Sequence, residues 1–164
     1  MKKEHYILLA ILSIFFLAFS RLIPHPPNFT PILATCIFAG MKFKQNLYSY
    51  FTPIIAMFIS DILIGLHTGI LVVYPTLLIT VFLSRKFKSI NSASLLCSLL
   101  FFIVTNLQVW MFSSMYQKNI SGLIECYTLA LPFFSMTLIS TFLYSYILFI
   151  GFALITKMKI TDKI

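Results

Sequence analysis

Charged residues in general, and acidic residues in particular, are scarce in this chain. Only four of its 164 residues are Asp or Glu, and charged residues of both signs make up 10% of the sequence. A soluble domain carries about 25% charged residues, so this chain could not cover a water-exposed surface. Hydrophobic residues make up 60% of it. We therefore expect an all-α integral membrane protein whose residues 1–164 form a single transmembrane domain in the lipid bilayer.

Motifs of the common enzyme classes are also missing. The chain contains no HExxH, GxSxG, Walker or GxGxxG sequence, so we expect no enzymatic activity, no catalytic residues and no cofactor. Cys36, Cys97 and Cys126 show no paired spacing that would predict disulfides. His25 and His67 do not match a known ligand spacing, so we also expect no metal.

Basic residues dominate the charge, which sums to a formal +8. Ten of the twelve lie in four clusters separated by long apolar stretches: Lys2/Lys3, Lys42/Lys44, Arg85/Lys86/Lys88 and Lys157/Lys159/Lys163. Because basic residues mark the cytoplasmic ends of membrane spans, each neighbouring pair of clusters brackets two crossings. The clusters predict a bundle of six transmembrane helices in the bacterial inner (cytoplasmic) membrane, with both termini cytoplasmic. They account for the positive charge without a nucleic-acid partner.

The apolar segments give the expected spans, at residues 6–23, 29–41, 48–66, 70–83, 94–112 and 133–156. The second span is short enough for a re-entrant segment, but the alternation of basic clusters favours a crossing. A helical extension over 123–131 precedes the last span, which Pro132 begins or kinks. The lysines ahead of the first apolar run also fit a signal peptide, whereas the five later apolar segments favour a retained span.

Polar residues of the spans and connections gather at the expected outer end of the bundle. From the helical rise, Asp61 and Asn106 lie about 18–20 Å above the inner ends of their spans, and Tyr74 reaches a similar level. We expect these groups to face a cavity that opens to the outside. The candidate binding residues are Arg21, His25, Asn28, Asp61, His67, Asn106, Trp110, Tyr116, Glu125 and Tyr127.

Asp61 gives the sharpest signal, because an unpaired carboxylate costs several kcal/mol in hydrocarbon. It could contact a ligand or a cation, form a structural ion pair with Arg21, or cap the helix start after the first span. We expect Arg21 to pair with Asp61 in preference to Glu125. Asn106 and Trp110 share a helix face. There they could bind a ligand, or instead supply an interhelical hydrogen bond and an interfacial anchor.

Four segments resemble a family of small, uncharacterised bacterial membrane proteins: RLIPHPPNFTPI (21–32), SDILIGLH (60–67), TNLQVWMF (105–112) and GLIECYTLALPFF (122–134). That family is similar in size and six-span layout to the substrate-binding S components of energy-coupling-factor vitamin transporters. The resemblance implies a ligand pocket at the outer end. S components that dock on an energising transporter module often carry small residues at four-residue spacing in span 1. Here Ala10 and Ala18 are followed at that spacing by Ile14 and Leu22, which argues against docking on such a module.

Two hypotheses of different classes fit these observations. The first is a membrane-embedded binding or uptake protein for a small polar, vitamin-like molecule. Asp61, Asn106 and Trp110 would line its pocket, and the other candidates would form the mouth. The second is a structural or assembly subunit of a membrane complex with no ligand, whose outer polar cluster ties helices and loops together. A membrane enzyme ranks third. An open cavity reaching Asp61 would favour binding, and a packed, fully paired cluster would favour the structural subunit.

Overall fold

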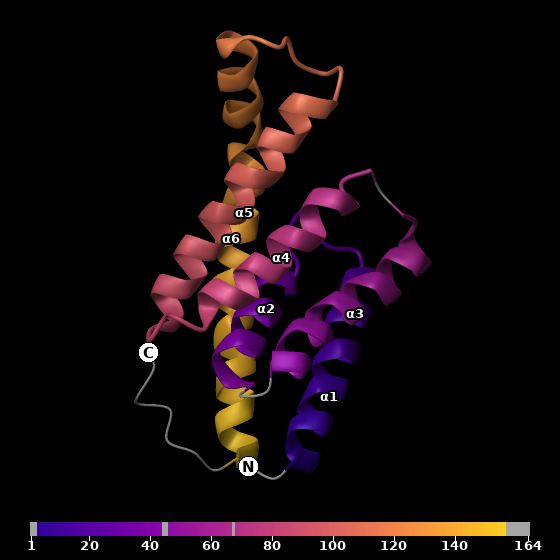
Figure 1. Cartoon of the computed structure of the whole chain (residues 1–164), viewed down its shortest axis with the longest axis vertical. Coiled ribbons are helices and arrows are strands. Elements are labelled where there is room, and N and C mark those ends of the chain that lie inside the picture. Colours follow the sequence, from indigo (N-terminus) through magenta and orange to yellow (C-terminus); the bar gives the residue numbers. More distant parts are fainter. Residues whose placement is uncertain (1–2, 44–45, 67, 157–164) are drawn as a thin grey trace.

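The computed structural model describes residues 3–43, 46–66 and 68–156, and the regular elements in this part of the chain are all α-helices. The described residues form six helices (Figure 1): α1 (Lys3–Leu22), α2 (Ile32–Lys42), α3 (Asn46–Ile64), α4 (Ile70–Ser84), α5 (Ile90–Phe112) and α6 (Ile120–Thr156). The prediction of an all-α chain with six helices is therefore confirmed for these residues.

The start of α2 differs from the sequence expectation. The helix begins at Ile32, and the three residues before it are not helical and follow a turn at residues 27 and 28. Asn28 has a left-handed backbone with φ of 63°, a conformation that asparagine tolerates better than most residues. The backbone N–H of Phe29 donates to the carbonyl of Pro26 at 3.0 Å. This local hydrogen bonding holds the chain out of the helix until Pro31.

The last helix also differs, because α6 runs without a break from Ile120 through Pro132. The expected extension and the expected last span are thus one helix of 37 residues. A proline removes one backbone hydrogen bond to the carbonyl four residues earlier, and membrane helices tolerate such a loss. Pro53 and Pro75 likewise lie inside α3 and α4.

Helix α2 lies at the centre of the bundle and contacts the five other helices. Eight of its 11 residues are buried. Gly40 lets α2 approach α4 closely, since a Cβ atom at this position would overlap the Ser84 side chain and the Val81 carbonyl. Around this centre, α1 packs mainly on α3, and α5 packs mainly on α6.

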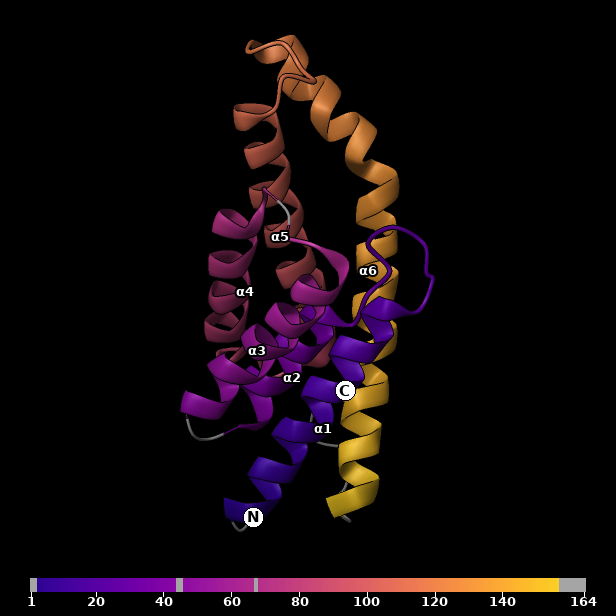
Figure 2. The same cartoon turned by 90° about the vertical axis from the view of Figure 1, so that its right-hand side faces the viewer.

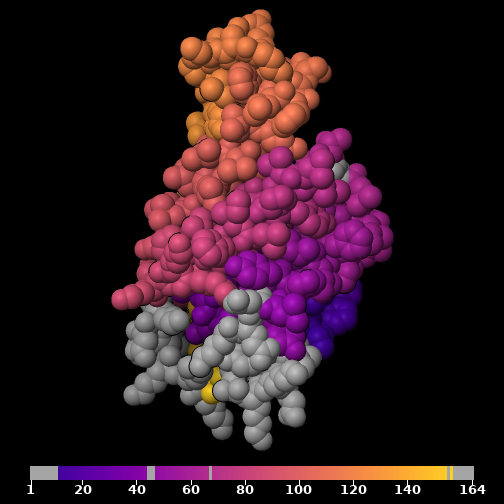
Figure 3. All heavy atoms as spheres, in the orientation of Figure 1, coloured from indigo at the N-terminus to yellow at the C-terminus, as the bar shows by residue number. Residues whose placement is uncertain are grey.

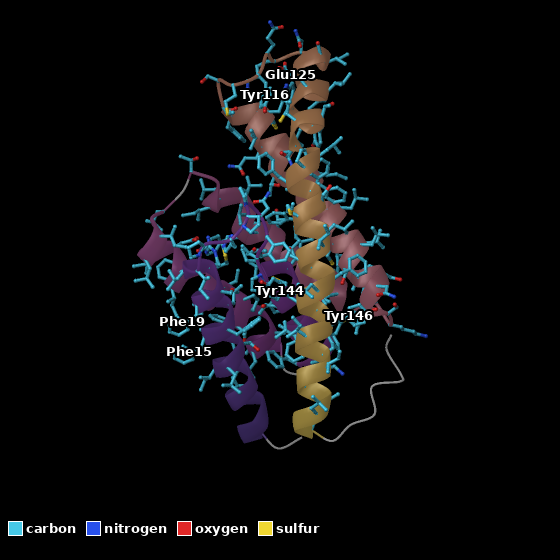
Figure 4. The ribbon with its side chains drawn as sticks, turned by 180° about the vertical axis from the view of Figure 1, so that it is seen from behind. Phe15, Phe19, Tyr116, Glu125, Tyr144 and Tyr146 are labelled. Carbon is cyan, nitrogen blue, oxygen red and sulfur yellow. The ribbon has the colours of Figure 1, made fainter. Side chains whose placement is uncertain are left out.

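Apolar side chains face outward, while hydroxyl groups lie between the helices. Phe15 and Phe19 are 55% and 59% exposed and project from α1 (Figure 4). Thr35 and Thr80 are fully buried, and their hydroxyls donate to the carbonyls of Pro31 and Thr76, four residues earlier in the chain, at 2.9 Å in each case. Small and hydroxyl-bearing residues at helix contacts are typical of membrane bundles, where lipid solvates the apolar exterior.

Three helices contain segments long and apolar enough to cross a membrane, judged by length and composition over the described residues. These segments are Leu47–Ile64, Ile90–Phe112 and Ile120–Leu154. Shorter apolar helices cover Ile11–Leu22, Ile32–Lys42 and Ile70–Ser84. The three candidate membrane-spanning helices suggest a membrane protein.

Helices α5 and α6 form a long hairpin that rises above the other four helices (Figure 1). Figure 2 shows α5 beside α4 and α6 on the opposite side of the bundle, joined at the top. The joined tip forms a narrow head above the broader body in the space-filling view (Figure 3). At the helical rise per residue, α6 is roughly 55 Å long, against about 30 Å for a hydrocarbon core.

At the end of the bundle where α2, α4 and α6 finish, basic side chains contact several neighbouring helix ends. Arg85 Nη2 donates to Ser49 Oγ at 2.9 Å and lies 3.5 Å from the carbonyl oxygen of Phe43. Lys42 Nζ lies 4.8 Å from the ring centroid of Phe152. These contacts bring together the ends of α2, α4 and α6 and the start of α3. We call this region the Arg85 end and the opposite one, where α1 and α3 finish, the Arg21 end.

Candidate functional site

Arg21 and Asp61 form a short ion pair between the last turns of α1 and α3. Arg21 Nη1 lies 2.6 Å from Asp61 Oδ1, and the two side chains are 13% and 1% exposed. The same nitrogen donates to Ser60 Oγ at 2.5 Å and lies 3.1 Å from Met57 Sδ. The predicted pairing of Arg21 with Asp61 is therefore confirmed.

Tyr74 of α4 completes this cluster. Its hydroxyl donates to Asp61 Oδ2 at 2.8 Å, so each carboxylate oxygen has a partner. The depth estimate that placed Asp61 and Tyr74 at one level is confirmed by this contact. Charge-assisted hydrogen bonds from a guanidinium and a hydroxyl stabilise a buried carboxylate. Of the roles considered for Asp61, the structural ion pair is the one that this geometry fits.

A cavity of about 290 Å³ lies beside the ion pair. Its walls come from the end of α1, the proline-rich loop, the start of α2, the end of α3, and α5 and α6. The lining residues are Arg21, His25, Asn28, Thr30, Ile32, Leu33, Ile64, Phe101, Thr137 and Thr141. Because His25, Asn28 and Ile64 are exposed, the cavity opens at the surface. Three sequence candidates, Arg21, His25 and Asn28, meet in this place.

The loop over residues 23–31 forms one wall because it is held against α6. Ser140 Oγ donates to the Asn28 carbonyl at 3.5 Å, and the Phe29 ring meets the Tyr144 ring edge to face, with centroids 5.7 Å apart. Figure 2 shows the loop running beside α6. His25 Nδ1 lies 3.0 Å from the Pro26 carbonyl oxygen within the loop. The turn at Asn28 thus fixes the side of the cavity opposite α3.

Arg21 uses one of its three guanidinium nitrogens for all of these contacts. Nη1 makes every hydrogen bond of Arg21 to the residues that the structure describes, and Nε and Nη2 make none. Neither nitrogen is among the buried side-chain donors without a partner in the described residues. The edge formed by Nε and Nη2 is therefore free to bind water or a polar ligand.

A second cavity of about 230 Å³ adjoins the first and shares Asn28, Phe101 and Thr137 with it. Asn106 lines this cavity and donates from Nδ2 to the Phe102 carbonyl at 2.8 Å. Its Oδ1 receives no hydrogen bond from the described residues. The rest of the wall is mainly apolar and is formed by Val73, Phe101, Phe102, Val109, Phe133 and Phe134.

A third cavity of about 690 Å³ continues between the start of α4 and the end of α5. It shares Val73, Thr105 and Val109 with the second cavity. Thr68 and Gln108 supply polar groups to its wall. The Arg21 end therefore carries a row of three adjoining spaces.

The other sequence candidates do not meet Arg21. Trp110 Nε1 donates to the Gln117 carbonyl at 2.9 Å, so its indole belongs to the connection between α5 and α6. Tyr127 donates to the Ile103 carbonyl at 2.7 Å. Tyr116 and the exposed Glu125 lie at the top of the hairpin (Figure 4). His67 lies outside the described residues.

The expected pocket of Asp61, Asn106 and Trp110 is thus not one space. Asn106 lines the second cavity, and the linings of the three cavities include neither Asp61 nor Trp110. Asp61 instead lies behind Arg21, which presents its guanidinium to the first cavity. Its 1% exposure follows from packing between α1, α3 and α4.

Several lining residues escaped the sequence analysis. Thr137 and Thr141 lie one turn apart on α6, are 7% and 1% exposed, and line the first cavity. Their four-residue spacing within an apolar helix was the available signal, since it places both hydroxyls on one face. In the part of the chain that the structure describes, no three His, Cys, Asp or Glu side chains gather in a metal-binding arrangement.

Comparison with known proteins gives a family without a described activity. No curated protein and no solved structure matches the chain. Residues 1–162 match a family described as "Family of unknown function (DUF6580)". This match covers nearly the whole sequence, in agreement with the expected uncharacterised family. The chain therefore belongs to the DUF6580 family.

Proposed function

We propose that this chain is a membrane-embedded binding or uptake protein for a small polar, vitamin-like molecule, similar in its role to the S components of energy-coupling-factor transporters. The observation that carries the proposal is the cavity lined by Arg21, whose Nε and Nη2 have no acceptor among the described residues. Its volume of about 290 Å³, extended by the adjoining cavity, falls in the range of small-molecule sites. Apolar walls with a few convergent polar groups are typical of such sites.

The proposal includes six spans in the bacterial inner membrane, with both termini in the cytoplasm and the cavities facing outward. The contacts of Lys42 and Arg85 support this orientation, because they gather basic residues from two connections at the Arg85 end. The turn over residues 65–69 carries no Lys or Arg. Because span 1 lacks the small-residue spacing, we propose that the protein works without an energising module.

A structural subunit is the second candidate, and one observation favours it. Both carboxylate oxygens of Asp61 are hydrogen bonded within the chain, as expected for a residue that ties helices together. The two proposals differ in the first cavity, which a structural subunit has no need to keep open to a small molecule.

Native mass spectrometry of the purified protein tests the two candidates directly. A binding protein should carry a small molecule, and Thr137→Leu should release it by filling the cavity. Ser135→Leu is the matched control, because this exposed hydroxyl residue lies half a turn away on α6. Protein that never carries a small molecule, but co-purifies with another membrane protein, would favour the structural subunit.

Reporter fusions test the proposed topology. A fusion after Lys88 or after Ile164 should report a cytoplasmic location, and a fusion near Lys118 an external one. An external C-terminus would contradict the six-span arrangement.

A further inference from the structure

The chemistry of the first cavity is set by the free edge of Arg21. Asp61 and Ser60 hold Nη1 at 2.6 and 2.5 Å, and Tyr74 holds Asp61 from the other side. The guanidinium therefore has one orientation. Its Nε and Nη2 form a planar pair of donors, which matches the two oxygens of a carboxylate. A lone carbonyl group offers these two donors a single, uncharged oxygen.

The start of α2 adds donors to the same wall. Ile32 and Leu33 line the cavity, and Pro31 at the N-cap supplies no side-chain hydrogen bond. Thr35 is the first residue of the helix whose N–H reaches a carbonyl in the preceding turn, that of Pro31 at 2.8 Å. The earlier N–H groups point away from the helix, and their partial positive charge favours an anion.

Among the described residues, no acidic side chain lines the first or the second cavity. Asp61 offsets part of the charge of Arg21 from behind, so attraction by net charge is weak. Recognition therefore depends on the direction of the donor edge. In the second cavity, four phenylalanine rings surround the space beside Asn106, an environment that suits an aromatic or apolar group.

We infer that the molecule bound here is a small aromatic carboxylic acid. Its carboxylate binds the Nε–Nη2 edge of Arg21 near the start of α2, and its body fills the phenylalanine-lined cavity. This inference rests on the proposed function and narrows it to one substrate class. Asn106 Oδ1, at the far side, accepts a hydrogen bond from a donor at the other end of the molecule.

Three probes of equal length test the carboxylate. They are 3-phenylpropionate, its primary amide and 3-phenylpropylamine, titrated by calorimetry into the full chain in nanodiscs of neutral lipid. The acid should bind, and the amine should not. The amide should bind at least about tenfold more weakly than the acid, a ratio that corresponds to about 1.4 kcal/mol. Equal binding of acid and amide would overturn the inference and leave small-molecule binding intact.

Two matched variants test the position. Arg21→Lys keeps a positive charge beside Asp61 but removes the planar edge, so it should weaken binding of the acid by about tenfold or more. Arg85→Lys makes the same change at the other end of the bundle and should leave the affinity unchanged. Unchanged affinity in Arg21→Lys, with the protein folded by circular dichroism, would overturn the inference.

Two further outcomes separate this inference from the proposed function. If no probe binds but native mass spectrometry finds a bound molecule without a carboxylate, only the inference fails. If no probe binds and the protein carries no molecule, both fail. If the acid binds in neutral lipid but not in nanodiscs of anionic phospholipid, lipid headgroups occupy the Arg21 edge, and this result would also overturn the inference.

Discussion

The two ends of the bundle use basic residues and space in different ways. At the Arg85 end, Gly40 brings α2 against α4, and Phe38 packs edge to face on Phe149, with centroids 5.3 Å apart. At the Arg21 end, three adjoining cavities separate the helices. The Arg21 end therefore holds three adjoining cavities, whereas the space toward the Arg85 end is a smaller apolar cavity of about 170 Å³ whose lining includes Phe38 and Phe152. A protein that only tied helices together would gain nothing from this difference.

The two arginines show the same contrast in their surroundings. Arg85 donates to Ser49 Oγ and to the Phe43 carbonyl oxygen and lies over the Tyr50 ring, 5.3 Å from its centroid. Arg21 pairs with the buried Asp61 carboxylate and lines the first cavity. A buried carboxylate beside a cavity costs stability unless it is paired. The Asp61 carboxylate at the Arg21 end therefore indicates that the orientation of the Arg21 guanidinium is important for the protein.

Removal of Arg21 should produce the largest effect. Arg21→Ala removes the ion-pair partner of the buried Asp61 carboxylate, and we expect a loss of about 3–5 kcal/mol in the free energy of unfolding. Thermal and denaturant unfolding of the purified protein in detergent would measure it. Adding Asp61→Asn removes the stranded charge and should recover part of the loss. Strictly additive losses in the double variant would contradict the ion pair.

Removal of the Tyr74 hydroxyl should have the next largest effect. Tyr74→Phe deletes one hydrogen bond to a charged oxygen, which is worth about 1.5–3 kcal/mol. Tyr146→Phe is the control, because its hydroxyl donates to the neutral Asn91 Oδ1 at 2.6 Å on the exposed side of α6. That loss should be about 0.5–1.5 kcal/mol. An equal fall in melting temperature for both variants would mean that Tyr74 contributes no charge-assisted bond.

The sequence predicted the helices and the ion pair for clear physical reasons. In a membrane, a long apolar segment between basic clusters pairs its own backbone N–H and C=O groups by forming a helix. The helical rise then placed Asp61 and Tyr74 at one level. The match of residues 1–162 to a family of unknown function agrees with the expected membership in an uncharacterised family, while the four motifs themselves stay a prediction.

A cavity was predicted, but the residues that line it were not, because helical rise gives depth but not rotation about the helix axis. Trp110 and Asn106 share a face of α5, yet the indole is held by Gln117 and the amide faces the second cavity. The wall at Asn28 depends on a left-handed backbone, which asparagine tolerates but which the sequence alone does not assign to this residue. The role of Thr137 depends on which face α6 turns toward the loop.

At the Arg85 end, a change at Gly40 should test close packing. Gly40→Ala places a Cβ atom against the Ser84 side chain and the Val81 carbonyl, and such overpacking costs about 1–3 kcal/mol. Gly151→Ala is the control, because a Cβ there has no neighbour within 4 Å among the described residues. In a helix interior this change should stabilise by about 0.5–1 kcal/mol. If both variants melt alike, the close contact of α2 with α4 does not contribute measurably to the stability of this end.

The smallest effect on stability should come from a hydroxyl in the cavity wall. Thr137 Oγ1 donates to the Phe133 carbonyl at 2.9 Å, and its oxygen still has capacity to accept from a ligand. Thr137→Val should therefore change the free energy of unfolding by less than about 1 kcal/mol. It should weaken the calorimetric affinity for 3-phenylpropionate, because the cavity wall loses a hydrogen-bond acceptor. Thr80→Val removes an equivalent bond, at 2.9 Å to the Thr76 carbonyl, in the packed interior between α2 and α4. It should leave the calorimetric affinity unchanged. If the two variants lose affinity equally, the Thr137 hydroxyl does not face the bound molecule, and the difference between the two ends does not extend to their threonines.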